Sequence, residues 1–220
     1  MSPTVLGTPP STRTQRVLLT LEELGIEYEL KNVDLGKGQH HDPEYVKEHH
    51  PFAKVPVFQD SGFEIFESRA ISRYLAVKND SPLIPHYGDA KALAAFEQLA
   101  SVEYAYFEPA VSTLAFELIF KRLFNLGETN QATVDQQKAL LNTTLDYYNR
   151  VLDTQDYLAG ENYSLVDLFH VPWLGFLRDR LQLGEVIDSR KNVASWAERI
   201  AQRPASKAVA AKATQHLVDL

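Results

Sequence analysis

The sequence predicts a small α/β domain followed by an all-helical domain. The first 80 residues alternate between short strand-like and helix-like segments, whereas the chain from Asp89 onward shows helical periodicity and no convincing strand. Between these parts, the stretch 79–85 reads Asn-Asp-Ser-Pro-Leu-Ile-Pro, which is the composition of a linker. We therefore expect domains at residues 1–80 and 89–220, joined by a linker at 81–88.

Each segment of the first domain has its own local signal. A short strand is expected at Thr4–Leu6, and a helix at about 14–24, where apolar residues recur at helical spacing before Gly25. Residues 26–33 alternate between apolar and polar side chains, as a strand does. The order β-α-β-α-β-β-α is completed by a helix at 43–47, strands at 55–59 and 63–66 around a turn at 60–62, and a helix whose N-cap is expected at Ser68.

The second domain contains long amphipathic segments. They run from about Ala90 to Phe124, with a kink expected at Pro109, and from about Val134 to Leu152. Ser164 and Asp167 form a capping box at the head of another apolar helix. Two shorter helices are expected before and after residues 203–204. Most aromatic side chains of the first long segment are expected in the core, with some left to line a ligand pocket: Tyr104, Tyr106, Phe107, Phe116, Phe120 and Phe124. Both tryptophans, Trp173 and Trp196, are expected in the core.

Composition excludes several classes of function. The 220 residues carry a formal net charge of −7, so no positive field attracts nucleic acid or an anionic membrane. The chain has no cysteine, which excludes a disulfide scaffold, a thiolate metal site and a cysteine nucleophile. The N-terminus is too polar for a signal peptide, and no run approaches 18 apolar residues. We expect a cytoplasmic protein without nucleic-acid or membrane partners.

Ser11 lies between the first expected strand and the first expected helix. A serine at this place is an N-cap in the simplest interpretation. A hydroxyl at a helix N-terminus can also donate to an anion, because the helix dipole and the free backbone amides assist it. The residues alone leave both interpretations open.

Two further motifs could bind a peptide-like ligand. Glu67 and Ser68 stand where a strand ends and a helix begins, so they could hold the ammonium and carboxylate of an amino acid. Val55 precedes Pro56 and is restricted to an extended conformation, which leaves its backbone able to pair with an extended ligand. A simple helix cap and a strand edge would give the same patterns.

The histidine pairs at 40–41 and 49–50 raise the question of zinc. The chain has neither a cysteine nor an HExxH pattern, so the usual signatures of a zinc site are missing. We expect no metal, and histidines that lie on the surface or contact a ligand.

Taken in order, these motifs resemble the phi class of the glutathione transferases over nearly the whole chain. The resembling stretches lie at 11–18, 33–35, 51–56, 66–71, 114–120, 157–160, 164–167 and 203–206. The resemblance implies a thioredoxin-like first domain, an all-helical second domain, and glutathione as the co-substrate. It also implies a homodimer.

The resemblance assigns roles to single residues. It implies that Ser11 is the catalytic serine, that Ser164 and Asp167 form a structural cap, and that Phe52 enters the partner in a dimer. The residues that it places on glutathione are His40, His41, Lys54, Val55, Pro56, Glu67, Ser68 and Arg69, with Pro56 expected in the cis form. Those that it places near the electrophile are Thr12, Leu35, Phe116, Ile119 and Phe120.

This chain departs from the family pattern at two places. Ala53 and Lys54 stand where the family has Gly-Gln, and His41 stands where it has lysine. Both departures fall at the end that would meet the glycyl carboxylate of glutathione. Lys54 keeps a donor and adds charge, so we expect binding to survive.

The function implied is conjugation of glutathione to small hydrophobic electrophiles, in detoxification or a stress response. Two alternatives stay open on the same fold. One is a glutathione-dependent peroxidase, in which the thiolate attacks the oxygen of an organic hydroperoxide. The other is a carrier of apolar ligands.

Overall fold

The computed structural model of the chain describes residues 2–218. It divides into two compact units, one joining the segment up to Ile84 to the segment from Gln202 onward, the other spanning Pro85–Ala201. The expected helical domain at 89–220 and this second unit therefore differ by the terminal helix, which packs with the first unit. Each unit is described separately below.

The first unit is built on a four-stranded sheet. The chain forms β1 (Thr4–Gly7), α1 (Thr12–Glu23), β2 (Glu29–Asn32), η1 (Gln39–His41), α2 (Pro43–Glu48), β3 (Val57–Asp60), β4 (Phe63–Phe66), α3 (Ser68–Lys78) and, at its end, α11 (Pro204–Val218). The strand order is β2-β1-β3-β4, with β1 parallel to β2 and antiparallel to β3, and with β3 antiparallel to β4. The expected order β-α-β-α-β-β-α is confirmed.

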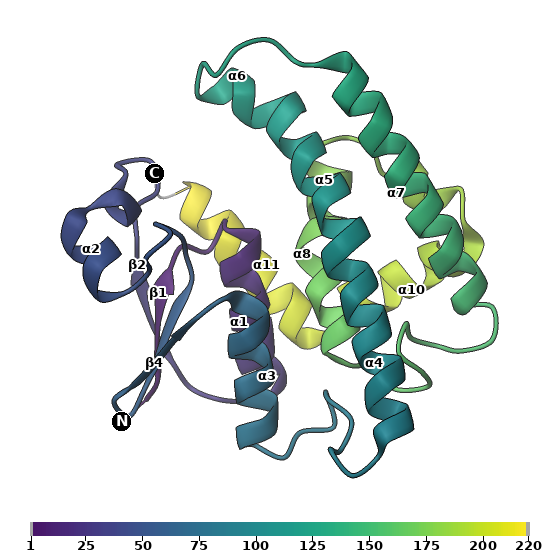
Figure 1. Cartoon of the computed structure of the whole chain (residues 1–220), viewed down its shortest axis with the longest axis horizontal. Helices are drawn as coiled ribbons and strands as arrows, with labels where there is room; N and C mark the ends of the chain where they lie inside the picture. The colour runs from purple at the N-terminus through teal and green to yellow at the C-terminus, as the bar shows by residue number, and fades with distance from the viewer. Residues whose placement is uncertain (1, 219–220) are drawn as a thin grey trace. The chain divides into compact units, whose positions relative to one another are not determined.

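The two faces of the sheet carry different helices. Leu6 and Val57 are register partners on one face and pack with Tyr45 of α2. Val5 and Phe58, the next register pair, are fully buried on the other face, because successive strand residues point to opposite sides. Helices α1 and α3 pack together along that second face, and Figure 1 shows α2 across the sheet from them.

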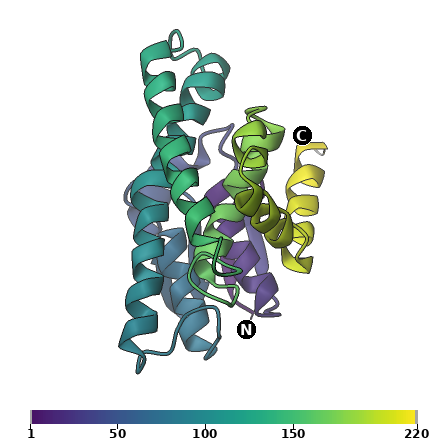
Figure 2. The same ribbon diagram turned by 90° about the vertical axis from the view of Figure 1, so that its right-hand side faces the viewer.

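The second unit consists of helices throughout its described elements. They are α4 (Ala90–Val102), η2 (Glu103–Phe107), α5 (Glu108–Ala115), η3 (Phe116–Phe120), α6 (Lys121–Leu123), α7 (Gln131–Val151), α8 (Leu165–Asp179), α9 (Glu185–Asp188) and α10 (Lys191–Ala201). The run from α4 to α6 is one long helix, and it lies beside α7 in both views (Figures 1 and 2).

Two π-helical segments interrupt the long helix. The Glu108 N–H bonds to the carbonyl of Glu103, and the Lys121 N–H to that of Phe116, so each bond spans five residues. The disruption expected at Pro109 is thus a π-helical segment directly before it. Each segment inserts an extra residue into the helical repeat.

The expectation that most of the aromatic side chains on this helix lie in the core is wrong. Phe107 is fully buried, but Tyr104, Tyr106, Phe116 and Phe124 are exposed in this chain. Each π-helical segment adds one residue to the repeat, so regular α-helical spacing does not predict the face of the residues that come after it. The two tryptophans are buried as expected: Trp173 and Trp196.

The capping box expected at the head of α8 is present. Ser164 Oγ accepts the Val166 N–H, and the Asp167 carboxylate accepts the Ser164 N–H at 3.0 Å. Asp167 is fully buried and also accepts the Leu158 N–H at 2.9 Å. Burial raises the pKa of the Asp167 carboxyl, and these hydrogen bonds oppose the rise.

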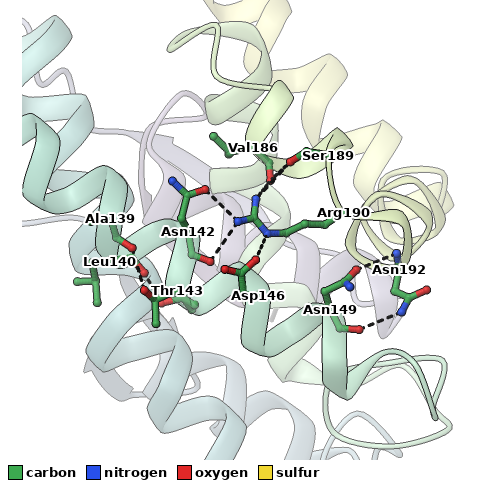
Figure 3. Close-up of polar contacts among 11 residues, drawn as sticks. Ala139, Leu140, Asn142, Thr143, Asp146, Asn149, Val186, Ser189, Arg190 and Asn192 are labelled. Carbon is green, nitrogen blue, oxygen red and sulfur yellow. Dashed lines mark hydrogen bonds and ion pairs between the residues drawn. The ribbon is translucent and has the colours of Figure 1, made fainter.

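Polar side chains join α7 to the segment between α9 and α10 (Figure 3). The Arg190 guanidinium binds Asp146 Oδ1 at 2.7 Å, Asn142 Oδ1 at 3.0 Å and the Val186 carbonyl at 2.6 Å. These contacts satisfy a half-buried charge and fix where α10 starts. In the part of the chain that the structure describes, no helix has the length and apolar character needed to span a bilayer.

Candidate active site

The candidate site residues of the first unit meet at one end of its sheet. Leu6 pairs with Val57, and Val57 pairs with Phe66. The chain just after β1, just before β3 and just after β4 therefore reaches the same end of the sheet. These three places hold Ser11, the Val55–Pro56 pair and the Glu67–Ser68 pair, and helices α1 and α3 both start there.

Ser11 is the N-cap of α1. It has extended backbone angles (φ −70°, ψ 120°), and its Oγ accepts the Thr14 N–H at 3.3 Å. A serine hydroxyl has one proton and two lone pairs. The cap uses a lone pair, and no acceptor for the proton is found among residues 2–218. The two interpretations of Ser11 are thus compatible, since a capping serine still has a donor to offer.

Gly7 and Thr14 hold the first turn of α1 against the end of β1. A Cβ on Gly7 would lie 2.7 Å from Thr14 Oγ1, so only glycine permits this approach. Thr14 is fully buried, and Thr12 is also buried, with its Oγ1 accepting from Arg13. The close packing fixes the turn that carries Ser11.

The helix following β4 starts differently from the sequence expectation. Glu67, not Ser68, is the N-cap of α3, and its side chain makes no capping bond. Its backbone has φ 72° and ψ 107°, a conformation that costs a non-glycine residue about 1–3 kcal/mol. The strained turn makes Ser68 the first helical residue. Glu67 is exposed, Ser68 is buried and Arg69 is half-buried beside them.

The Val55–Pro56 peptide bond is cis, as the resemblance implied. Pro56 is buried, and the Val55 side chain packs against the cluster of Leu6, Val33 and Val57. This packing fixes Val55 against the unit directly before β3.

Tyr45 and Ala53 shape the loop that precedes β3. The Tyr45 hydroxyl donates to the Lys54 carbonyl at 2.7 Å, and burial raises the pKa of Tyr45 to about 12. Lys54 itself is exposed. Ala53 has φ 52°, in the left-handed region that favours glycine. This backbone geometry explains why a glycine suits the position that Ala53 occupies here.

His40 and His41 lie in η1 with their ring centroids 3.9 Å apart. The Nδ1 atom of His40 is buried without a hydrogen-bond partner. Burial lowers the pKa of His40, and the nearby charges of His41 and Lys54 act in the same direction. His40, His41 and Lys54 therefore lie near enough to one another for their charges to interact.

Phe52 lies in the turn between α2 and β3, and 69% of its surface is exposed in this chain. Its ring makes edge contacts with His50 and Phe66, at centroid distances of 6.2 and 6.4 Å. His50 is buried, and its Nδ1 accepts the Phe52 N–H at 3.3 Å. The loop is thus ordered while it presents a large apolar side chain outward.

The residues expected near the electrophile are spread over both units. In the first unit, Leu35 is exposed and Thr12 is buried. In the second, Phe116, Ile119 and Phe120 all fall in the π-helical segment η3. Phe116 is exposed, and Phe120 contacts Phe124 and Phe176 by its ring.

The sequence interpretation missed three residues that shape the site: Gly7, Thr14 and Tyr45. Each acts through packing or a hydrogen bond to a neighbouring loop, and single residues of these types carry no distinctive spacing. The sequence interpretation also expected His50 on the surface or against a ligand, whereas His50 is buried and accepts the Phe52 N–H. Among residues 2–218, no group of three or more histidine, aspartate or glutamate side chains lies where it could hold a metal ion.

Comparison with known proteins supports this arrangement. Residues 1–77 match the glutathione S-transferase N-terminal domain family, and residues 104–204 match its C-terminal domain family. Glutathione S-transferase PM239X14 of Arabidopsis thaliana is 43% identical over 193 residues, covering 86% of this chain and 87% of that protein. The crystal structure of poplar glutathione transferase F1 superposes with a TM-score of 0.90 at 32% identity, over 98% of this chain and 99% of that one.

A third similar structure holds a glutathione conjugate. Glutathione S-transferase I from maize, in complex with an atrazine–glutathione conjugate, has a TM-score of 0.87 at 30% identity, over 97% of this chain and 99% of that one. The chain therefore belongs to the glutathione S-transferase family, and its fold is the thioredoxin-like domain plus helical domain of that family. It is a phi-like glutathione transferase, and glutathione is its co-substrate.

Proposed function

We propose that the Ser11 hydroxyl donates a hydrogen bond to the thiolate of glutathione and holds it for attack on a small hydrophobic electrophile. The observation that carries the proposal is the hydrogen bonding of the Ser11 side chain. It caps α1 by accepting the Thr14 N–H, and its proton has no acceptor among the described residues. The thiolate would then face both a free donor and the positive end of a helix.

The Ser11 hydrogen bond and the helix N-terminus together supply enough free energy to ionise the thiol of glutathione. A thiol with a pKa of about 8.5 is mostly protonated at neutral pH, and lowering that pKa by about two units requires roughly 2.7 kcal/mol. A hydrogen bond to a charged group supplies about 1.5–3 kcal/mol. A helix N-terminus adds about 0.3–1 kcal/mol. No protein base is needed, because the thiol of glutathione is itself the acid that releases the proton.

The remaining donors fit the two ends of the tripeptide. Glu67 would pair with the γ-glutamyl ammonium, while Ser68 at the head of α3 would bind the carboxylate beside it, with Arg69 nearby. The Val55 backbone, before cis-Pro56, would pair with the cysteinyl unit. At the glycyl end, the carboxylate would meet the cluster of His40, His41 and Lys54.

The residues that we propose near the electrophile come from both units. Thr12 and Leu35 belong to the first unit; Phe116, Ile119 and Phe120 belong to the second. The atrazine conjugate in the maize relative supports the class of small hydrophobic electrophile. We also propose that the protein acts in detoxification or stress and lies in the cytoplasm. A homodimer anchored by Phe52 is part of the same proposal.

The test of the serine role is an ultraviolet titration of bound glutathione. Ser11→Ala should retain glutathione but reduce its ionisation roughly ten- to a hundredfold, because about 1.5–3 kcal/mol of anion stabilisation is lost. Ser11→Thr keeps both the hydroxyl and the cap and should stay near wild type. An unchanged thiol pKa in Ser11→Ala would remove Ser11 from the mechanism.

A matched variant separates chemistry from capping. Asn130 caps α7 by accepting the Thr133 N–H at 3.1 Å, in the same way that Ser11 caps α1. Asn130→Ala should lower stability by about 1 kcal/mol and leave the thiol pKa unchanged.

The overall reaction is tested by paired assays of glutathione conjugation to an aryl halide and of glutathione-dependent reduction of an organic hydroperoxide. Transferase activity should dominate. Activity confined to the hydroperoxide would favour the peroxidase alternative. Binding of apolar ligands with neither activity would favour a carrier.

A further inference from the structure

The terminal helix α11 packs along α1 and is held by polar contacts at several points. Near its start, the Arg203 guanidinium binds both carboxylate oxygens of Glu23 at 2.6 Å. Further along, Lys212 pairs with Glu22 and binds the Tyr28 hydroxyl at 2.6 Å. These contacts fix α11 to the end of α1 that is remote from Ser11.

The other end of α11 reaches the loop that carries Ser11. His216 Nε2 lies 3.2 Å from Thr8 Oγ1, a hydrogen bond between residues 208 positions apart. Thr8 is buried, and its carbonyl accepts the Ser11 N–H at 3.0 Å. The contact therefore bears on the residue that closes the turn in front of the N-cap.

Gln15 and His216 both support the turn from Thr8 to Ser11. Gln15 is local, and its Nε2 donates to the Pro9 carbonyl at 2.9 Å. His216 comes from the far end of the chain. Because two residues of the turn are prolines, which have no N–H to donate, loss of either support would let the Ser11 hydroxyl vary in direction.

We propose that His216 is a positioning residue for Ser11 and acts through Thr8. The catalytic part of this inference rests on the proposed function of Ser11. His216 fixes Thr8, Thr8 holds the Ser11 amide, and the hydroxyl is then pre-directed toward the thiolate. Pre-organisation of this kind raises the fraction of molecules in which the donor is in place before the ligand binds.

The experiment compares two substitutions of His216. His216→Phe keeps a ring of similar size without polar atoms, whereas His216→Gln keeps a group that can bond to Thr8. We expect His216→Phe to raise the thiol pKa and lower kcat roughly two- to tenfold, as for a lost neutral hydrogen bond, with little change in glutathione affinity. His216→Gln should restore most of the loss.

Thr8→Val tests the partner, since valine has the shape of threonine without the hydroxyl. It should reproduce the effect of His216→Phe, and the double variant should be no worse than either single one. Lys212→Met is the control, because it loosens α11 elsewhere. It should lower thermal stability without changing the thiol pKa. Full additivity in the double variant, or failure of glutamine to rescue, would overturn the proposal.

Amide hydrogen exchange provides a readout that does not depend on catalysis. In His216→Phe the Ser11 amide should exchange several-fold faster, whereas the amides of the α1 interior should not. If Ser11→Ala leaves the thiol pKa unchanged, the serine mechanism fails, and the exchange of the Ser11 amide alone then decides whether His216 orders the turn. Wild-type exchange at Ser11 in His216→Phe would refute the positioning role.

Discussion

Trp196 Nε1 donates a hydrogen bond to Asp167 Oδ1 at 2.9 Å, in the core of the helical unit. The same carboxylate accepts the backbone N–H groups of Leu158 and Ser164. Asp167 therefore joins the start of α8 to α10 and to the loop before α8, which is more than a capping residue does.

Asp167→Ala should destabilise the protein while leaving its chemistry intact. It would leave four buried donors without their acceptor, namely the N–H groups of Leu158 and Ser164, the Ser164 hydroxyl and the Trp196 indole N–H, so we expect a loss of about 3 kcal/mol in the free energy of unfolding and slower refolding. Chemical denaturation measures the loss. Trp196→Phe, which removes one donor and keeps the carboxylate, should cost less. Unchanged stability with lost activity would reverse this assignment.

Glu67→Gln and Ser68→Ala should weaken glutathione binding more than they change its thiol pKa. They remove the partners proposed for the γ-glutamyl end, whereas Ser11 is the partner proposed for the thiolate. Loss of one charged hydrogen bond corresponds to roughly ten- to a hundredfold in affinity. Calorimetry on each variant is the check, and wild-type affinity in both would mean that the ligand lies elsewhere.

Phe52→Ser should shift the protein toward monomer. In a two-fold dimer the side chain is used twice, and each burial is worth roughly 1.5–3 kcal/mol. Activity should fall as well, because the same loop leads into Val55 and Pro56. Phe63→Ser is the matched control, since Phe63 is another exposed phenylalanine of this unit. Sedimentation at low micromolar concentration decides; a variant dimer as tight as wild type would exclude Phe52 as an anchor.

His50 should make stability fall on mild acidification. Burial lowers the pKa of the imidazole in the folded chain, whereas an exposed histidine titrates near 6.5. The neutral ring is therefore favoured by folding. Its contribution is complete above pH 6.5, declines as the pH falls below that value, and is lost once the pH has passed the folded pKa.

The comparison is between wild type and His50→Gln, by urea unfolding at several pH values from 8 downward. Glutamine keeps an acceptor for the Phe52 N–H and does not titrate. The stability difference between the two proteins should shrink as the pH falls. A constant difference would show that the pKa of His50 is the same in the folded and unfolded states, which would contradict the prediction.

The sequence was sufficient for the order of elements and for the residues at the sheet edge. Strong local signals explain this success, such as Gly25, which ends α1 with φ 63°, and the capping box of Ser164 and Asp167. The strand expected at 26–33 was too long, because only Glu29–Asn32 pairs with β1. Alternation of side chains describes exposure, while the extent of pairing depends on the length of the neighbouring strand.

Other features depend on contacts that a linear pattern does not contain. The N-cap of α3 is Glu67 and not the predicted Ser68, because the chain takes a positive φ at Glu67. This conformation is one that a glutamate does not favour. The packing of α11 on α1 depends on pairs such as Arg203 and Glu23, 180 residues apart. Neither residue type nor spacing signals such pairs.

The two π-helical segments of the long helix have a consequence for insertions and deletions. Since a regular turn has 3.6 residues, one extra residue rotates everything downstream by about 100°. Removing one residue from Glu103–Phe107 would turn the whole of α5 about its axis. Removing one residue from Phe116–Phe120 would redirect only the end of the long helix, from this segment through α6. A relative lacking one residue at the second place could thus keep its core and present different side chains from Phe116 onward, so the helical unit can change this surface without changing its packing.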